Sequence, residues 1–112
     1  MRELLYFLFG FFLLSACQEG FSQAVWERQN SGTSSDLNGV FFTSENTGFA
    51  VGLGGTILRT TDAGQNWSRQ NSGTSSTLHS VYFIDDDTGI AVGSGGTILR
   101  TTNGGQSWSR QN

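Results

Sequence analysis

Short runs of β-branched and aromatic residues alternate with clusters of glycine, serine, asparagine and aspartate along most of the chain. The runs are "VFF", "FAVG", "TILRTT" and "NWSRQ", and none extends into the long apolar stripe of an amphipathic helix. Short runs bounded by turn-forming residues are typical of β-strands that are joined by tight turns. The pattern therefore predicts an all-β protein.

The whole pattern occurs twice with a fixed period. Trp26, Trp67 and Trp108 lie 41 residues apart, and residues 27–67 match residues 68–108 at 27 of 41 positions. A period of about 40 to 45 residues is typical of the four-stranded blades of β-propellers. We predict strands over residues 37–43, 49–52, 56–61 and 66–70, with copies 41 residues later, and hence two four-stranded antiparallel blades.

Composition and charge narrow the classes of function. The 112 residues include 16 glycines, only 13% are charged, and the net charge is −3. The acidic residues are scattered and no basic stripe is present, so a nucleic-acid partner is not expected. A single cysteine excludes an internal disulfide framework and a cysteine-based zinc site.

The first residues have the features of an export signal. Arg2 precedes an apolar run from residue 4 to residue 14, which is too short to span a bilayer as a lone helix. The following "LSAC" resembles the lipobox of bacterial lipoproteins, in which the cysteine is acylated and becomes the mature N-terminus. We therefore predict a lipoprotein signal peptide over residues 1–16, a linker over 17–24, and two 41-residue repeats plus one extra outer strand over 25–112.

Acylation of Cys17 would anchor the repeats to a membrane, either in the periplasm or at the cell surface. The alternative is ordinary secretion after cleavage at Ala24, because "SQA" offers a small-x-small cleavage site. Both routes place the repeats outside the cytoplasm.

The connection before the last strand of each blade carries the most specific motif. Its first copy, "TTDAGQNW", resembles the Asp-box, or bacterial neuraminidase repeat, and implies a turn in which the aspartate accepts backbone hydrogen bonds. The glycine takes the positive-φ position, and the tryptophan packs under the turn. The second copy has asparagine in place of the acid, which keeps one acceptor oxygen and loses the charge. The structural turn residues are Thr60, Asp62, Gly64 and Trp67, and Thr101, Asn103, Gly105 and Trp108.

The 41-residue period, the Asp-box and the stretch "TGFAVGLGGTILRTTDAGQNW" together resemble the photosystem II stability and assembly factor family of β-propellers. The resemblance covers residues 25–112 and implies a non-enzymatic scaffold that binds a protein partner and needs no cofactor. In that family an arginine-bearing surface makes the contact, and Arg59 and Arg100 occupy equivalent positions here. A recurrent arginine on an outer strand is also compatible with a solvated or ion-paired residue.

Asp-boxes also occur in sialidases, so a glycan-binding or sialidase-related propeller is the alternative function. A sialidase needs an arginine cluster, a tyrosine nucleophile with a nearby glutamate, and a general acid. Tyr82 aligns with Phe41 in a predicted core strand, and His79 has no catalytic partner. The acids of residues 85–87 could bind calcium, but the corresponding turn reads "SEN", so no metal site is predicted.

The number of repeats is small for a closed propeller, which has about four to eight blades. The outer-strand sequence occurs three times, at residues 26–30, 67–71 and 108–112, whereas the inner strands occur twice. We expect the two blades to be a fragment of a larger closed propeller. The alternative is a short chain that assembles with other copies into a ring.

Overall fold

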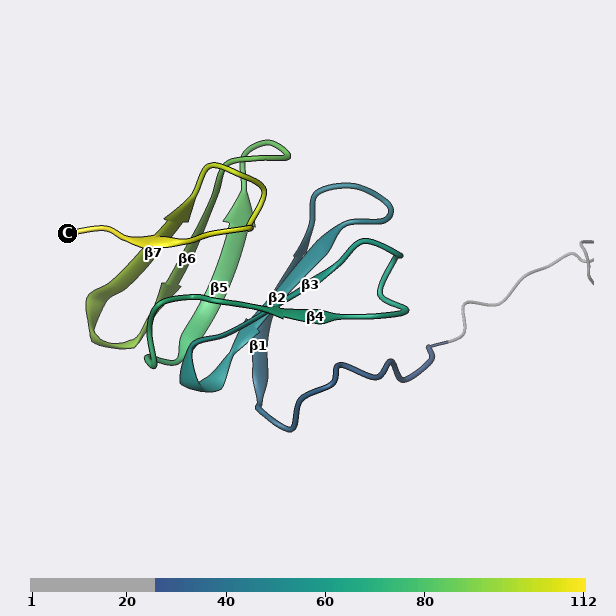
Figure 1. Ribbon diagram of the computed structural model, residues 1–112. Coiled ribbons are helices and arrows are strands. Elements are labelled where there is room, and N and C mark those ends of the chain that lie inside the picture. Colours follow the sequence, from purple (N-terminus) through teal and green to yellow (C-terminus); the bar gives the residue numbers. More distant parts are fainter. Residues whose placement is uncertain (1–25) are drawn as a thin grey trace, which may run out of the picture.

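The computed structural model describes residues 26–112, which form two four-stranded antiparallel sheets (Figure 1). The first sheet contains β1 (Leu37–Phe42), β2 (Gly48–Gly52), β3 (Thr56–Thr60) and β4 (Ser68–Gln70), and the second contains β5 (Leu78–Phe83), β6 (Gly89–Gly93), β7 (Thr97–Thr101) and β8 (Ser109–Arg110). In each sheet the strands lie in the order of the sequence. The predicted all-β fold with two four-stranded blades is confirmed.

The middle strands of each sheet are joined by a short turn that requires glycine. The 3-10 turns η1 (Leu53–Gly55) and η2 (Ser94–Gly96) connect β2 to β3 and β6 to β7. In η1, Gly54 and Gly55 have φ values of 68° and 76°, a left-handed conformation that a β-carbon disfavours. The repeated "GG" therefore closes both hairpins in the same way.

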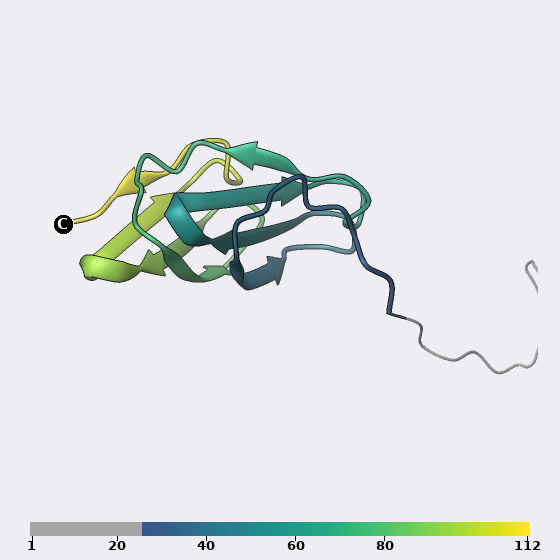
Figure 2. The ribbon, with the colours of Figure 1, turned by 90° about the horizontal axis from the view of Figure 1, so that it is seen from below.

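The core lies between the two sheets, which pack face to face (Figures 1 and 2). Side chains of alternate residues along a strand point to opposite faces of the sheet. Because the two sheets are copies of one repeat, each has the same two faces, which carry corresponding residues. We call them the knob face, which in the first sheet carries Phe49, Val51 and Ile57, and the socket face, which in the second sheet carries Leu78, Val81, Phe83, Ala91, Leu99 and Trp108. The knob face of the first sheet fills the socket face of the second.

The segment before β1 differs from its prediction. Residues 26–30 form no strand, and the Trp26 side chain is 97% exposed. An outer strand pairs with the third strand of a sheet, and the free edges of β3 and β7 are already taken by β4 and β8. The copy of the outer-strand sequence at residues 26–30 therefore finds no free edge of a third strand among the described residues.

Tyr82 is also placed differently from its prediction. It lies on the knob face of the second sheet, where the side chain is 59% exposed and its ring centroid lies 4.9 Å from that of Phe41. It is not a core residue, because no described residues form a further sheet against this face.

The predicted signal peptide, the linker and Cys17 lie outside the described residues. In the part of the chain that the structure describes, no helix has the length and apolar character needed to cross a membrane.

Candidate functional site

The first Asp-box turn uses its carboxylate internally. Asp62 Oδ1 accepts hydrogen bonds from the Thr60 hydroxyl and the Asn66 backbone N–H, both at 2.8 Å, and Oδ2 accepts from Asn66 Nδ2 at 2.7 Å. Thr60 Oγ1 accepts from the backbone N–H of Gly64 at 2.9 Å. The Asn66 side-chain amide, the Asn66 backbone N–H and the Thr60 hydroxyl lower the pKa of Asp62. The acceptor atoms of Asp62 thus stabilise the turn.

The second Asp-box turn keeps this bonding pattern without the charge. Asn103 Oδ1 accepts from the Thr101 hydroxyl at 2.9 Å and from the Ser107 backbone N–H at 3.0 Å. Asn103 Nδ2 then donates to Ser107 Oγ at 2.8 Å. In the first turn the side chain of Asn66 donates to Asp62, whereas in the second turn the serine at the equivalent position, Ser107, accepts from Asn103. Two coupled substitutions therefore preserve one turn.

Both turns need two consecutive left-handed residues, where the sequence indicated only one. Ala63 and Gly64 have φ values of 62° and 92°, and Gly104 and Gly105 have values of 70° and 85°. Ala63 is the only non-glycine residue with positive φ among residues 26–112. It occupies a conformation that costs a residue with a β-carbon roughly 1–2 kcal/mol.

Each turn positions an indole against the last phenylalanine of the first strand in its sheet. Trp67 Nε1 donates to the Gly64 carbonyl at 3.0 Å, and the Trp67 ring lies edge-to-face with Phe42, with centroids 6.2 Å apart. Phe83 and Trp108 repeat this pair at 5.9 Å. Together with Gly64 in the first turn or Gly105 in the second, each pair forms a socket for an aromatic side chain.

The socket of the second sheet is filled by Phe49 of the first sheet. The Phe49 ring stacks on Phe83 with centroids 4.4 Å apart and lies edge-to-face with Trp108 at 6.4 Å. A β-carbon on Gly105 would overlap the Phe49 ring and lie 2.8 Å from Cζ, so only glycine leaves room for the ring. Trp108 Nε1 is buried without a hydrogen-bond partner among the described residues. The motif predicted as a turn thus also shapes the contact between the sheets.

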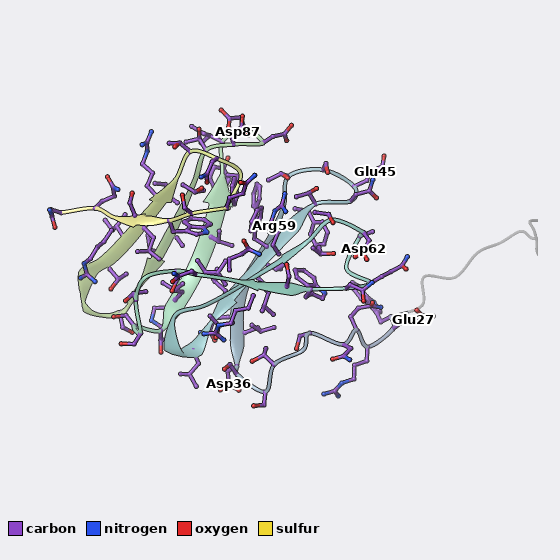
Figure 3. All side chains as sticks on the ribbon, in the orientation of Figure 1. Glu27, Asp36, Glu45, Arg59, Asp62 and Asp87 are labelled. Carbon is purple, nitrogen blue, oxygen red and sulfur yellow. The ribbon has the colours of Figure 1, made fainter. Side chains whose placement is uncertain are left out.

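The candidate partner-binding arginines lie on the two knob faces. Arg59 is opposite Phe49 in the register of β2 and β3, and its guanidinium carbon lies 5.9 Å from the centre of the Phe49 ring. The side chain is partly buried between the sheets, and its Nε has no hydrogen-bond partner in the described part of the chain (Figure 3). Arg100 occupies the equivalent place opposite Ile90 and is exposed.

The arginines of the outer strands have a different environment. Arg69 donates to the hydroxyl of Thr56 at 3.3 Å, and Arg110 donates to that of Thr97 at 3.4 Å. These contacts connect the outer strand to the third strand of the same sheet. They indicate a structural role, which separates Arg69 and Arg110 from Arg59 and Arg100.

The acidic turn at residues 85–87 also bonds to itself. Asp85 Oδ1 accepts from the backbone N–H groups of Asp87 at 2.9 Å and Thr88 at 2.7 Å, and these two donors lower the pKa of Asp85. Ser44 Oγ accepts the equivalent bonds in the first sheet. No group of three histidine, cysteine or acidic side chains within residues 26–112 is placed to hold a metal ion. His79 Nε2 lies 3.0 Å from Ser94 Oγ at the exposed edge.

The sequence did not identify Phe49 and Gly105 as interface residues. The alternation of β2 places Phe49 on one face, but the contact with Gly105 spans two sheets and requires the structure. The signal in the sequence is weak, because the position equivalent to Phe49 holds Ile90.

Comparisons with known proteins give consistent matches over most of the chain. The family model described as "Photosynthesis system II assembly factor YCF48" matches residues 18–112. A solved structure described as "YCF48 bound to D1 peptide" is 32% identical with a TM-score of 0.65, and the match covers 70% of this chain and 26% of that one. YCF48 from Cyanidioschyzon merolae is 28% identical with a TM-score of 0.71, over 80% of this chain and 30% of that one.

The chain therefore spans between a quarter and a third of the length of these two solved proteins. No curated protein sequence matches it.

Proposed function

Because the chain belongs to the photosynthesis system II assembly factor YCF48 family, we propose that it is a non-enzymatic β-propeller scaffold that binds a peptide segment of a photosystem II protein. The observation that carries this proposal is the similarity to YCF48 bound to D1 peptide, at 32% identity over 70% of the chain. The internal use of the Asp62 carboxylate by its own turn supports a structural role for the motif over a catalytic one.

Arg59 and Arg100 are the proposed peptide-binding residues. A guanidinium group presents a planar fork of donors that pairs with a carboxylate through two parallel hydrogen bonds. Arg100 is exposed, and the Arg59 side chain is partly exposed, although its Nε atom is buried. The peptide that these side chains favour carries a carboxylate, from an acidic side chain or from its C-terminus.

We also propose that the chain is exported and held at a membrane through acylated Cys17. The "LSAC" sequence after a short apolar run supports this location. A diacylated N-terminus would hold the propeller at a membrane surface, since two acyl chains give stable anchoring.

Titration of the full chain into a fluorescently labelled D1 peptide, followed by anisotropy, tests the proposal. Arg100→Ala should weaken binding about tenfold or more, because a hydrogen bond to a charged group contributes about 1.5–3 kcal/mol. Arg28→Ala is the matched control, since it removes the same charge from an exposed position outside both sheets. The proposal fails if the peptide does not bind, or if both variants lose the same affinity.

A further inference from the structure

Two asparagines in the sequence are followed directly by glycine, and the fold places them in different settings. Asn38 and Gly39 lie in β1, whereas Asn103 and Gly104 lie in the second Asp-box turn. Glycine has no β-carbon to shield its backbone nitrogen from the side chain of the preceding residue. In an asparagine–glycine pair this nitrogen can therefore close a five-membered ring on the asparagine side chain.

We propose that Asn103 is a site of spontaneous deamidation. The Gly104 backbone nitrogen attacks Asn103 Cγ and loses its proton to solvent, the bond between Cγ and Nδ2 breaks, and ammonia leaves with a proton taken from solvent. Water then opens the succinimide ring. Cleavage of the bond between Cγ and the Gly104 nitrogen gives aspartate, and cleavage at the other carbonyl carbon gives isoaspartate. The net change is the uptake of one water and the release of one ammonia.

The contacts of the Asn103 side chain favour this attack. Its Oδ1 accepts hydrogen bonds from the Thr101 hydroxyl at 2.9 Å and from the Ser107 backbone N–H at 3.0 Å. Two donors on a carbonyl oxygen stabilise the negative charge that develops there when a nucleophile adds to the carbon. Asn103 is exposed and Gly104 is partly exposed, so water reaches the reacting atoms.

One hydrogen bond opposes the reaction. The Gly104 N–H donates to the Asp87 carbonyl at 2.9 Å, and this bond must open before the nitrogen can lose its proton. Asp87 lies in the exposed loop between β5 and β6, at one end of the second sheet (Figure 3). Exposed loops open at a lower free-energy cost than core strands. Opening of this loop frees the nitrogen and leaves the strand ladder in place.

Asn38 has the same neighbour in the sequence, but its setting resists ring closure. Its Nδ2 donates to the Leu78 carbonyl of the second sheet at 3.0 Å. Gly39 pairs with β2, and a β-carbon on it would lie 3.1 Å from the His79 carbonyl oxygen. Ring closure at Asn38 therefore requires movement of backbone that is packed between the two sheets. The structure thus separates two sites that the sequence makes alike.

The first Asp-box turn shows that aspartate fits at this position. Asp62 accepts from the Thr60 hydroxyl and the Asn66 backbone N–H, as Asn103 accepts from the equivalent donors. In the aspartate product the second carboxylate oxygen accepts from the Ser107 hydroxyl, which rotates to donate. Conversion to aspartate therefore preserves the turn and adds a negative charge, whereas isoaspartate lengthens the backbone and disrupts the turn.

The first turn also supplies a variant that blocks ring closure. Ala63 holds the position of Gly104 there, with a φ of 62° against 70° for Gly104. A β-carbon on Gly104 would have its nearest contact at 3.4 Å, with the Asp86 carbonyl oxygen, so alanine fits. Gly104→Ala should therefore fold, and it should slow the conversion of Asn103 several-fold because the β-carbon shields the nitrogen.

Mass spectrometry of the full chain after ageing at mildly alkaline pH provides the test. The chain is digested with pepsin in acid, so that digestion itself causes no deamidation. Ageing in denaturant is the reference, in which Asn38 and Asn103 should convert at similar rates. In the folded chain Asn103 should convert several-fold faster than Asn38, and Gly104→Ala should remove most of this difference. Asn103→Asp should melt close to the temperature of the unaltered chain.

Three results would each overturn the proposal. In the first, Asn103 stays intact in the folded chain while the denatured chain converts, or it converts no faster than Asn38. In the second, Gly104→Ala folds but converts as fast as the unaltered chain, so the reaction does not pass through the Gly104 nitrogen. In the third, Asn103→Asp is strongly destabilised, so the aspartate product does not fit the turn. If Gly104→Ala does not fold, the rates at Asn103 and Asn38 in the unaltered chain decide.

Discussion

Replacement of Gly105 by alanine tests whether the Asp-box glycine makes room for the neighbouring sheet. Gly64 is the matched site, because it holds the same place in the first turn, and its φ of 92° is close to the 85° of Gly105. The two positions differ in what an added β-carbon would meet. A β-carbon at Gly64 would lie 3.7 Å from Trp67 Cζ2, which is an ordinary contact. A β-carbon at Gly105 would overlap the Phe49 ring.

The expected magnitudes follow from this difference. Alanine at either site costs about 1–2 kcal/mol for the left-handed conformation, partly offset by about 0.4–1 kcal/mol because alanine restricts the unfolded chain. Gly64→Ala should therefore lower the free energy of unfolding by about 1 kcal/mol. Gly105→Ala adds an overpacking cost of about 1–3 kcal/mol, for a total of about 2–4 kcal/mol.

Urea denaturation followed by tryptophan fluorescence measures both variants, at a concentration where the chain is monomeric. Phe49→Ile, which introduces the residue found at position 90, completes a double-mutant cycle with Gly105→Ala. In the Phe49→Ile background the cost of Gly105→Ala should fall toward that of Gly64→Ala. If Gly105→Ala leaves no folded baseline while Gly64→Ala still shows a transition, the same order of stability is established.

Equal losses of stability for Gly64→Ala and Gly105→Ala would refute the reasoning, since backbone conformation alone would then explain both. A cost of Gly105→Ala that is independent of the residue at position 49 would do the same.

Further outcomes follow from the other features. Asp62 has a lowered pKa in the folded chain, so its contribution to stability is present above its ordinary pKa of 3.8 and is lost as the pH falls through the lowered pKa. Asp62→Asn should therefore flatten the acidic part of a plot of melting temperature against pH, and an unchanged slope would contradict this. Ala63→Gly should raise the melting temperature slightly, because it relieves a left-handed alanine, and an unchanged or lower value would argue against strain at this residue. Cys17→Ser should release the chain from the membrane fraction of an expressing bacterium, and full retention would exclude lipid anchoring at this residue. The full chain should not hydrolyse a fluorogenic sialoside, and turnover that a point substitution in the repeats abolishes would support the sialidase-related alternative.

The fold was predictable because its determinants are local. Glycine pairs, polar turn residues and short apolar runs define each hairpin, and the 41-residue period places four strands in each blade. The predicted strands agree with β1 to β3 to within a residue at each end. β4 begins two residues later than predicted, because Asn66 and Trp67 belong to the hydrogen-bonded turn and not to the ladder.

The parts that the sequence did not predict depend on which surfaces meet. Alignment of the repeats placed Tyr82 with Phe41 in the core, but Phe41 is covered by the second sheet and Tyr82 is uncovered. Arg59 and Arg100 also occupy equivalent positions in the repeats. Arg59 is partly buried because the second sheet covers its face, whereas Arg100 is exposed because no described sheet covers its face. Identical sequence therefore does not give identical environment at the two ends of an array, because each repeat buries its faces only against its neighbours.

The Asp-box connects the local and the long-range features of this chain. Its hydrogen bonds fix both turns, and the second turn presents Gly105 and Trp108 to Phe49 of the adjacent sheet. The acid itself is replaceable, since Asn103 with Ser107 maintains the turn through a reversed side-chain pair. Gly105 is not replaceable in the same way, because the space above it is occupied by Phe49. The motif therefore tolerates change where its partners lie within the turn and resists change where its partner lies in the next blade.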